Sequence, residues 1–262
     1  MTYDMHTHSN NSFDSKATII DMCKSAIKNS ITDISFTEHF SMDNHKKTYG
    51  YMNFERYFKD IEIAKNLFLN NLNIYTGLEL CEPHENTNKF KNTLKNLNFD
   101  MILGSVHNIN NVGHRAICKN FTKKEAYDMY FNEVLKLVSF GDFDIAAHLD
   151  LMNRYAFNSL GNYEFKDYYD ILKSILNKLI SRGIGIEINT SGLRNSLNDI
   201  HPKLEILKLY KSLGGEIITI GSDAHKPSDV GANCKEALDL LKNLDYKYIF
   251  TFKNRKPIAN II

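Results

Sequence analysis

The chain has 262 residues, of which 43% are hydrophobic and 24% are charged, and its formal net charge is +1. This length and apolar content suit one α/β barrel domain, and residues 1–262 are predicted to form a single domain. The near-neutral charge and the absence of dense Lys/Arg blocks argue against a protein that binds long nucleic acid nonspecifically.

The cysteine pattern and the apolar runs predict the cellular location of the protein. Cys23, Cys81, Cys118 and Cys234 show no CxxC spacing. The chain opens without a charged leader and apolar segment, and no apolar run reaches the roughly 18 residues of a membrane span. We therefore expect a cytoplasmic protein with no membrane partner.

Two histidines near the start of the chain, His6 and His8, alternate in a strand-like run over residues 3–8. Side chains two residues apart on a strand project from the same face, so both imidazoles would point together. Paired imidazoles suit a borderline transition metal such as zinc. Asp14 follows on a polar loop, where taken alone it is expected to cap or solvate the start of a helix predicted over residues 17–29.

The middle of the chain alternates predicted strands with predicted helices. Strands are expected over residues 31–37, 73–80, 99–106 and 143–147, and helices over residues 53–70, 86–97, 122–139 and 164–181. These strands finish at chemically similar residues, namely His39, Glu79, His107 and His148. Residues 108–120 are expected to form a loop that contains Arg115, and Arg154 is expected on the loop after the fifth strand.

Three more charged or ionisable residues, Glu82, His84 and Glu85, crowd the turn after the third strand. They are expected to belong to a solvated loop and are left out of the predicted metal set. A pairing of Glu82 or Glu85 with a substrate amine is the alternative for these acids.

The last part of the chain repeats the strand-end pattern. A sixth strand is predicted over residues 184–189, with Arg194 beyond it, and a seventh over residues 216–220 leads to Asp223 and His225. Helices are expected over residues 201–213 and 230–244. A β-like run over residues 247–252 then precedes a basic tail that contains proline.

Strands that alternate with helices imply βαβ units and a parallel sheet, in which functional residues gather at the carboxyl ends of the strands. We therefore predict an α/β fold, a distorted (β/α)7 TIM-like barrel, with a metal site at those ends. His6 and His8 can share a metal with Asp223 only if the first and seventh strands lie side by side. The run over residues 247–252 is accordingly expected outside the ring.

The strand-end motifs, taken in this order, resemble those of the polymerase and histidinol phosphatase (PHP) family. They are His-Thr-His at residues 6–8, Glu-His at 38–39, Gly-Leu-Glu at 77–79, Gly-Ser-Val-His at 104–107, Ala-His-Leu-Asp at 147–150 and Gly-Ser-Asp-Ala-His at 221–225. Within the family the chain is most similar to the monofunctional histidinol-phosphate phosphatases, through residues 13–15, 185–194 and 252–257.

The resemblance implies three divalent metal ions, which could be zinc, iron or manganese. A first ion would be held by His6, His8, Glu79 and Asp223, with Glu79 bridging to a second ion at His107 and His148. A third ion would be held by Asp14, His39 and His225. The family position of Asp14 is often a histidine, and an aspartate there still offers oxygen ligands.

The resemblance also implies an activity, the hydrolysis of L-histidinol phosphate to L-histidinol and phosphate in histidine biosynthesis. A hydroxide held between metals would attack phosphorus in line, with Glu79, Asp223 and His225 as the catalytic residues. A phosphate monoester also needs donors beyond the metals, and arginine offers planar bidentate ones. Arg194 is the leading candidate, followed by Arg154 and Arg115.

Three alternatives remain open at this point. A PHP phosphoesterase for another small phosphate ester or a nucleotide would share the ligands and differ in the loops around Arg115 and Arg154. A PHP nuclease or polymerase proofreading domain should have a basic groove or attached polymerase domains, and the sequence has neither. A non-catalytic metal-binding module should lack part of the cluster, whereas the predicted ligand set is complete.

Overall fold

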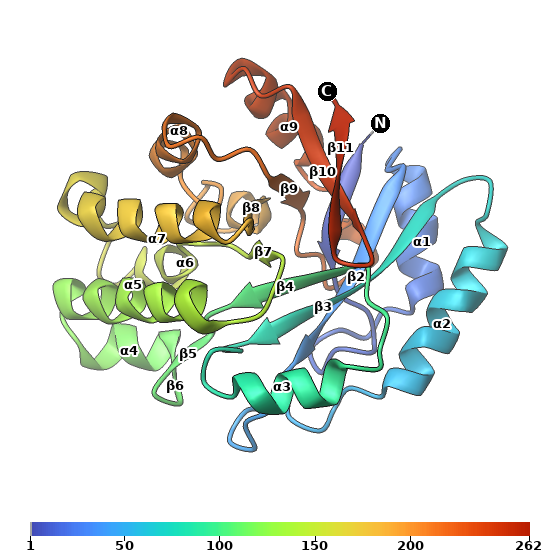
Figure 1. The fold of residues 1–262 in the computed structure, drawn as a ribbon, viewed down its shortest axis with the longest axis horizontal. Helices are drawn as coiled ribbons and strands as arrows, with labels where there is room; N and C mark the ends of the chain where they lie inside the picture. Colours follow the sequence, from blue (N-terminus) through green and yellow to red (C-terminus); the bar gives the residue numbers. More distant parts are fainter. Residues whose placement is uncertain (1) are drawn as a thin grey trace.

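The computed structural model describes residues 2–262, and its centre is a nearly closed ring of parallel strands (Figure 1). Seven strands pair in the order in which they occur along the chain. They are β1 (Tyr3–Thr7), β2 (Asp33–Phe40), β3 (Asn73–Cys81), β4 (Met101–Ser105), β7 (Ile145–Ala146), β8 (Gly185–Asn189) and β9 (Ile218–Gly221). The predicted seven-stranded α/β barrel is therefore confirmed.

The ring closes between β1 and β9 at the carboxyl ends of these two strands. The backbone N–H of His8 donates to the carbonyl of Ala224 at 2.9 Å, and that of Asp223 donates to the carbonyl of His6 at 2.8 Å. Gly221 permits this approach, because a Cβ at its position would lie 2.3 Å from the Cβ of His6. The first and seventh ring strands thus lie side by side, as the shared ligands require.

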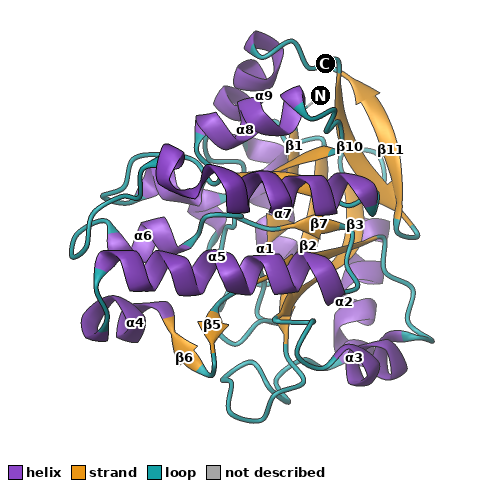
Figure 2. Cartoon of the chain, turned by 60° about the vertical axis from the view of Figure 1, so that its left-hand side comes forward, coloured by secondary structure: helices purple, strands orange, loops and turns teal. Residues whose placement is uncertain are grey.

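Helices cover the outside of the ring, and Figure 2 shows α5 and α7 running side by side across it. The longer helices are α1 (Ile19–Lys28), α2 (Phe54–Leu67), α3 (Thr87–Leu94), α5 (Lys123–Phe140), α7 (Tyr169–Ser181), α8 (Leu204–Ser212) and α9 (Cys234–Asn243). Local sequence fixes several starts. The Thr18 hydroxyl accepts from the N–H of Asp21, and Thr122 and Glu125 form a reciprocal capping box.

Several short elements differ from the sequence prediction. Residues 108–120 are not a loop but a hairpin, β5 (Asn108–Ile109) with β6 (Val112–Gly113), followed by the helix α4 (His114–Asn120). Arg154 lies in the helix α6 (Met152–Ala156) and not on a loop. Helices of seven and five residues are too short to show a clear apolar period, so periodicity could not detect them. Three 3-10 turns are also present, η1 (Phe165–Tyr168), η2 (Ser191–Arg194) and η3 (Pro227–Asp229).

The carboxyl-terminal segment forms an antiparallel hairpin of β10 (Tyr248–Lys253) and β11 (Lys256–Ile261) outside the ring. The expected position of the run over residues 247–252 is confirmed. The expectation of a simple tail after it is wrong, because β11 is a second strand. Asn254 and Arg255 turn the hairpin with φ of 49° and 63°. The usual sequence signal for such a left-handed pair is a glycine, and this turn contains none.

Buried apolar side chains from the strands and from their covering helices form one continuous cluster. All four cysteines are buried and unpaired. Within residues 2–262 no helix combines the length and the apolar character that crossing a membrane requires.

Candidate metal centre

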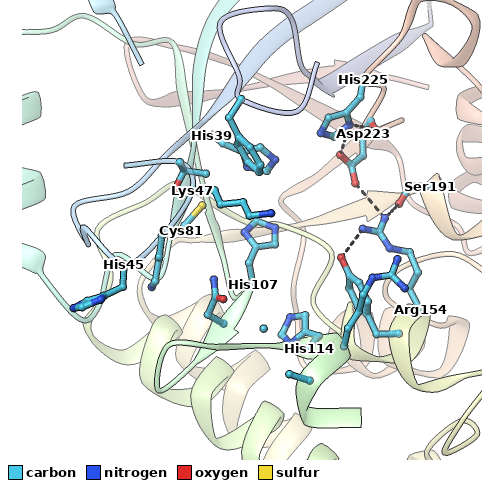
Figure 3. Close-up of a pocket in the computed structure, with 18 of the residues that line it drawn as sticks. His39, His45, Lys47, Cys81, His107, His114, Arg154, Ser191, Asp223 and His225 are labelled. Carbon is cyan, nitrogen blue, oxygen red and sulfur yellow. Dashed lines mark hydrogen bonds and ion pairs between the residues drawn. The ribbon is translucent and has the colours of Figure 1, made fainter. Parts of the chain in front are cut away.

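The structure brings all nine side chains of the predicted ligand set together at the carboxyl ends of the ring strands. Figure 3 shows four of them, His39, His107, Asp223 and His225, around one side of a cavity. Glu79 is at the middle of the group and is fully buried. The complete set is His6, His8, Asp14, His39, Glu79, His107, His148, Asp223 and His225, linked by contacts of 2.8 to 3.8 Å.

The first group joins strands β1, β3 and β9. The Nε2 atoms of His6 and His8 are 3.0 Å apart, and they lie 3.4 and 3.5 Å from Oε2 of Glu79. The same nitrogens lie 3.8 and 3.5 Å from Oδ1 of Asp223. Ligands bound at 2.0–2.1 Å around a tetrahedral ion are about 3.3 Å apart. These four side chains therefore have the spacing of ligands to one ion.

The other oxygen of Glu79 faces two further histidines. Oε1 lies 3.3 Å from Nε2 of His107 and 2.8 Å from Nε2 of His148. Oε2 faces His6, His8 and, at 2.9 Å, Nδ1 of His39. Because its two oxygens face different imidazoles, the carboxylate of Glu79 has the position of a bridge between two ions.

A third group lies nearer to solvent. Oδ2 of Asp14 is 3.4 Å from Nε2 of His39 and 3.4 Å from Nε2 of His225. The imidazole of His8 stacks against that of His39 and against that of His225, with ring centroids 4.3 and 4.2 Å away, and the His39 and His225 centroids are themselves 5.7 Å apart. Asp14 therefore lies with the cluster, and its expected role as a simple helix cap is wrong, since Thr18 caps that helix.

One buried atom provides a direct test of whether this cluster fits a cation. Oε2 of Glu79 is buried without a hydrogen-bond partner, although imidazole nitrogens surround it. A buried carboxylate oxygen without a partner is costly unless a positive charge compensates it. A divalent ion supplies that charge, and the mixed imidazole and carboxylate donors suit zinc, iron or manganese.

The ionisation of the cluster follows from its burial and its crowding. Burial alone would raise the pKa of Glu79 and of Asp223, but nearby imidazoles outweigh it and hold both values well below the ordinary range. Burial and the neighbouring His225 and His39 lower the pKa of His8 to about 3. His8 is therefore neutral near pH 7 and has a free lone pair for a metal.

Residues behind the histidines fix the orientation of their rings. Nδ1 of His6 donates to Oε1 of Glu187 at 2.7 Å, because a carboxylate can only accept. Nδ1 of His8 is 3.1 Å from the Ser12 hydroxyl, which itself donates to Glu38. Such partners turn the opposite ring nitrogen toward the metal position. The sequence analysis placed Glu187 only within the strand predicted over residues 184–189, and it gave no signal for Ser12.

Cys81 is a further member of the site that the sequence analysis did not select. Figure 3 shows its sulfur beside His107, and the ligating atoms of His39, Cys81 and His107 all lie within 4.8 Å of one another. Its position two residues after Glu79 on β3 was the available signal, because both side chains then point to the same face.

A cavity of about 830 Å³ opens in front of the cluster, and all three predicted arginines line it. Arg154 donates to the Ser191 hydroxyl at 3.1 Å and lies 3.6 Å from Oδ2 of Asp223. Figure 3 marks both contacts with dashed lines. Arg194 donates to the carbonyl of Ser222 and has one buried guanidinium nitrogen, Nη1, without a hydrogen-bond partner. The Arg115 guanidinium lies 5.3 Å from the centre of the Tyr155 ring.

The ionisable residues after the third strand do not have the surroundings that the sequence predicted. Glu82 is buried, pairs with Lys46 and accepts from the backbone N–H groups of His107 and Asn108. His84 pairs with Glu133 at 2.6 Å. Glu82 and His84 therefore do not belong to a solvated loop, and neither Glu82 nor Glu85 lines the cavity where a substrate amine would lie.

Comparison with known proteins agrees with this geometry. The family model described as PHP domain matches residues 4–191. The chain belongs to the PHP family. This match covers the ring strands from β1 to β8 and includes seven of the nine clustered side chains, all but Asp223 and His225.

Curated proteins named histidinol-phosphatase resemble the chain over its whole length. It is 32% identical over 264 residues to a probable histidinol-phosphatase of Clostridium acetobutylicum, covering 99% of this chain and all of that protein. It is 28% identical to the histidinol-phosphatase of Lactococcus lactis, covering 98% and 96% of the two chains. The crystal structure of histidinol phosphate phosphatase from L. lactis, complexed with zinc, L-histidinol and phosphate, superimposes with a TM-score of 0.88 at 27% identity and 98% coverage of both chains.

Proposed function

We propose that this PHP protein is a metal-dependent phosphomonoesterase that converts L-histidinol phosphate to L-histidinol and phosphate, a step of histidine biosynthesis. The observation that carries the proposal is a complete ligand cluster opening on an arginine-lined cavity. The full-length likeness to histidinol-phosphatases supports the substrate. The structure favours this function over that of a non-catalytic metal-binding module, because side chains with the spacing of metal ligands and positively charged arginines lie at the same cavity.

Three divalent ions, zinc, iron or manganese, are proposed as cofactors. His6, His8, Glu79 and Asp223 would hold the first, Glu79 with His107 and His148 the second, and Asp14, His39 and His225 the third. Bound there, the ions would supply a water of lowered pKa and would neutralise phosphoryl oxygens. Glu79, Asp223 and His225 are the catalytic residues of this proposal because they contact the cofactor.

Arg154 and Arg194 are proposed to bind and orient the phosphoryl group. Arg154 is held by Ser191 and Asp223 with its fork beside the cluster. Arg194 keeps Nη1 free to donate, since its other terminal nitrogen, Nη2, donates to the carbonyl of Ser222. Planar donors that are fixed before the substrate arrives stabilise developing phosphoryl charge without reorganisation. Arg115 is the third proposed substrate-binding arginine.

A cytoplasmic location is part of the proposal and rests on the four unpaired cysteines, which suit a reducing compartment. The proposed partner is a small phosphate monoester, and the net charge of +1 supports the exclusion of long nucleic acid.

The test is phosphate release from L-histidinol phosphate by metal-replete protein, beside a panel of small phosphomonoesters and a single-stranded oligonucleotide. Asp223→Asn should remove the activity, whereas Asp239→Asn, an exposed change on α9, should leave it intact. Hydrolysis of other monoesters alone would retain the metal site and reject the substrate. Absence of all hydrolysis with metals bound would reject the enzyme.

A further inference from the structure

The cavity in front of the cluster is strongly cationic. Its lining contains five cationic side chains, Lys46, Lys47, Arg115, Arg154 and Arg194, but only one carboxylate, that of Asp223. Asp223 is already surrounded by the imidazoles of the cluster. The charged side chains in the walls of this cavity therefore favour an anionic ligand over a cationic one.

Three of these cations already have acidic partners. Lys46 is bound by Glu82 and Glu85, Arg154 lies 3.6 Å from Asp223, and Arg194 lies 3.6 Å from Asp229. The remaining two, Lys47 and Arg115, form no ion pair with any residue in the range 2–262. They are the cations of the cavity whose charge is not yet compensated.

The positions of Lys47 and Arg115 suit a ligand inside the cavity. Figure 3 shows the ammonium group of Lys47 directed into the cavity beside His107. The Arg115 guanidinium lies over Tyr155, whose ring also lies 5.2 Å from the guanidinium carbon of Arg154. This stacking restrains Arg115 beside a phosphoryl-binding arginine, so less side-chain entropy is lost when it binds an anion.

One phosphate dianion does not use all of this charge. Arg154 and Arg194, with the ions of the proposed cofactor, match the phosphoryl group that is to be cleaved. We propose that Lys47 and Arg115 form a second anion subsite, through which the protein also takes small phosphate monoesters that carry another anionic group, a carboxylate or a second phosphate. Positive walls of a cavity focus the field on such a ligand and raise its local concentration.

The hydrolytic part of this inference rests on the proposed phosphatase function, whereas the binding part does not. In each turnover one water is consumed. Its oxygen bonds to phosphorus as the ester P–O bond breaks, and a proton passes to the departing alkoxide. The second anion stays on the alcohol product and is not altered.

Binding is tested with two non-hydrolysable probes that differ only in the second anion, 3-phosphonopropanoate and propylphosphonate. Isothermal titration calorimetry of the metal-loaded protein should give an affinity about tenfold higher for the carboxylate probe, which corresponds to about 1.4 kcal/mol. The double variant Lys47→Gln/Arg115→Gln should lose this difference. Lys119→Gln, which removes an exposed charge of the same helix α4 outside the cavity lining, should keep it.

Hydrolysis is tested with 3-phosphoglycerate and glycerol 3-phosphate, which differ by a carboxylate in place of a hydroxymethyl group, beside L-histidinol phosphate. We expect a higher kcat/KM for 3-phosphoglycerate than for glycerol 3-phosphate, through a lower KM, and a collapse of that ratio in the double variant. Equal affinities for the two phosphonates, or a difference that survives in the double variant, would overturn the subsite. If the affinities differ as expected and no monoester is hydrolysed, the subsite stands and the phosphatase proposal fails.

Discussion

Nδ1 of His6 lies 2.7 Å from Oε1 of Glu187, and both side chains are buried. The second oxygen of Glu187 accepts from the backbone N–H of His148 at 2.9 Å. One carboxylate on β8 therefore orients a proposed ligand of the first ion and the backbone of a proposed ligand of the second. Glu187 contacts neither ion position itself, so its effect can be separated from that of the ligands.

Glu187→Gln is expected to weaken metal binding by about 10- to 100-fold, because an amide is a poorer partner for the His6 ring than a carboxylate. Metal content after dialysis against a graded chelator series measures the loss. Excess metal should restore much of the phosphatase activity. Glu62→Gln, an exposed change on α2, is the control, and equal metal retention in both variants would contradict the role of Glu187.

Arg154→Met is expected to lower kcat/KM for L-histidinol phosphate by about 10²-fold or more, because it removes a fixed donor to the phosphoryl group. Arg154→Lys retains the charge but not the planar fork, so it should recover only part of the loss. Steady-state phosphate release measures both, with metal content checked in parallel. Wild-type activity in the Arg154→Met variant would show that Arg154 does not bind the phosphoryl group.

Gly221→Ala is expected to disturb the seam of the barrel and the cluster together. Its added methyl group would lie 2.3 Å from Oε1 of Glu187 and from the Cβ of His6. Overpacking of this kind costs about 1–3 kcal/mol in the free energy of unfolding, which urea titration measures. Gly113→Ala is the control, since the nearest atom to its new Cβ is 3.6 Å away. Unchanged stability and metal content in the Gly221 variant would show that the strands can separate freely there.

Metal binding is expected to release protons and to strengthen as pH rises. Burial lowers the pKa of His6, His39 and His107, but facing carboxylates outweigh it and raise all three pKa values well above the ordinary value. These imidazoles are therefore protonated in metal-free protein near pH 7, and a metal must displace those protons. Calorimetry in buffers of different ionisation enthalpy measures the number released. Affinity that does not change between pH 6 and 8 would contradict this expectation.

The ring and its cluster were predictable because their signals are local. His6 with His8, Glu79, and Asp223 with His225 each sit where an apolar run stops, and parallel strands carry such positions to one edge. The order of the strands then followed from closure, since β1 and β9 must meet to unite His6 with Asp223.

The remaining features depend on contacts that no local pattern contains. The sequence predicts Glu82 to be an exposed acid in a loop. It is buried, because Lys46 and two backbone N–H groups from distant segments form hydrogen bonds with its carboxylate. Nothing in the sequence distinguishes Lys47 from other surface lysines, and its place in the cavity lining is visible only in the folded structure. The helix that carries Arg115 is too short for its period to be visible.

The seam between β1 and β9 joins two segments that lie far apart in the amino-acid sequence. Asp4 accepts from the backbone N–H of Ser222, a residue 218 positions away, and the proposed first ion would link His6 and His8 to Asp223 beside that contact. An ion in this position would act as a removable cross-link that closes a loop containing most of the chain. Because closing a long loop removes much of the conformational entropy of the unfolded ensemble, metal content should govern the folding cooperativity of the barrel as well as its chemistry.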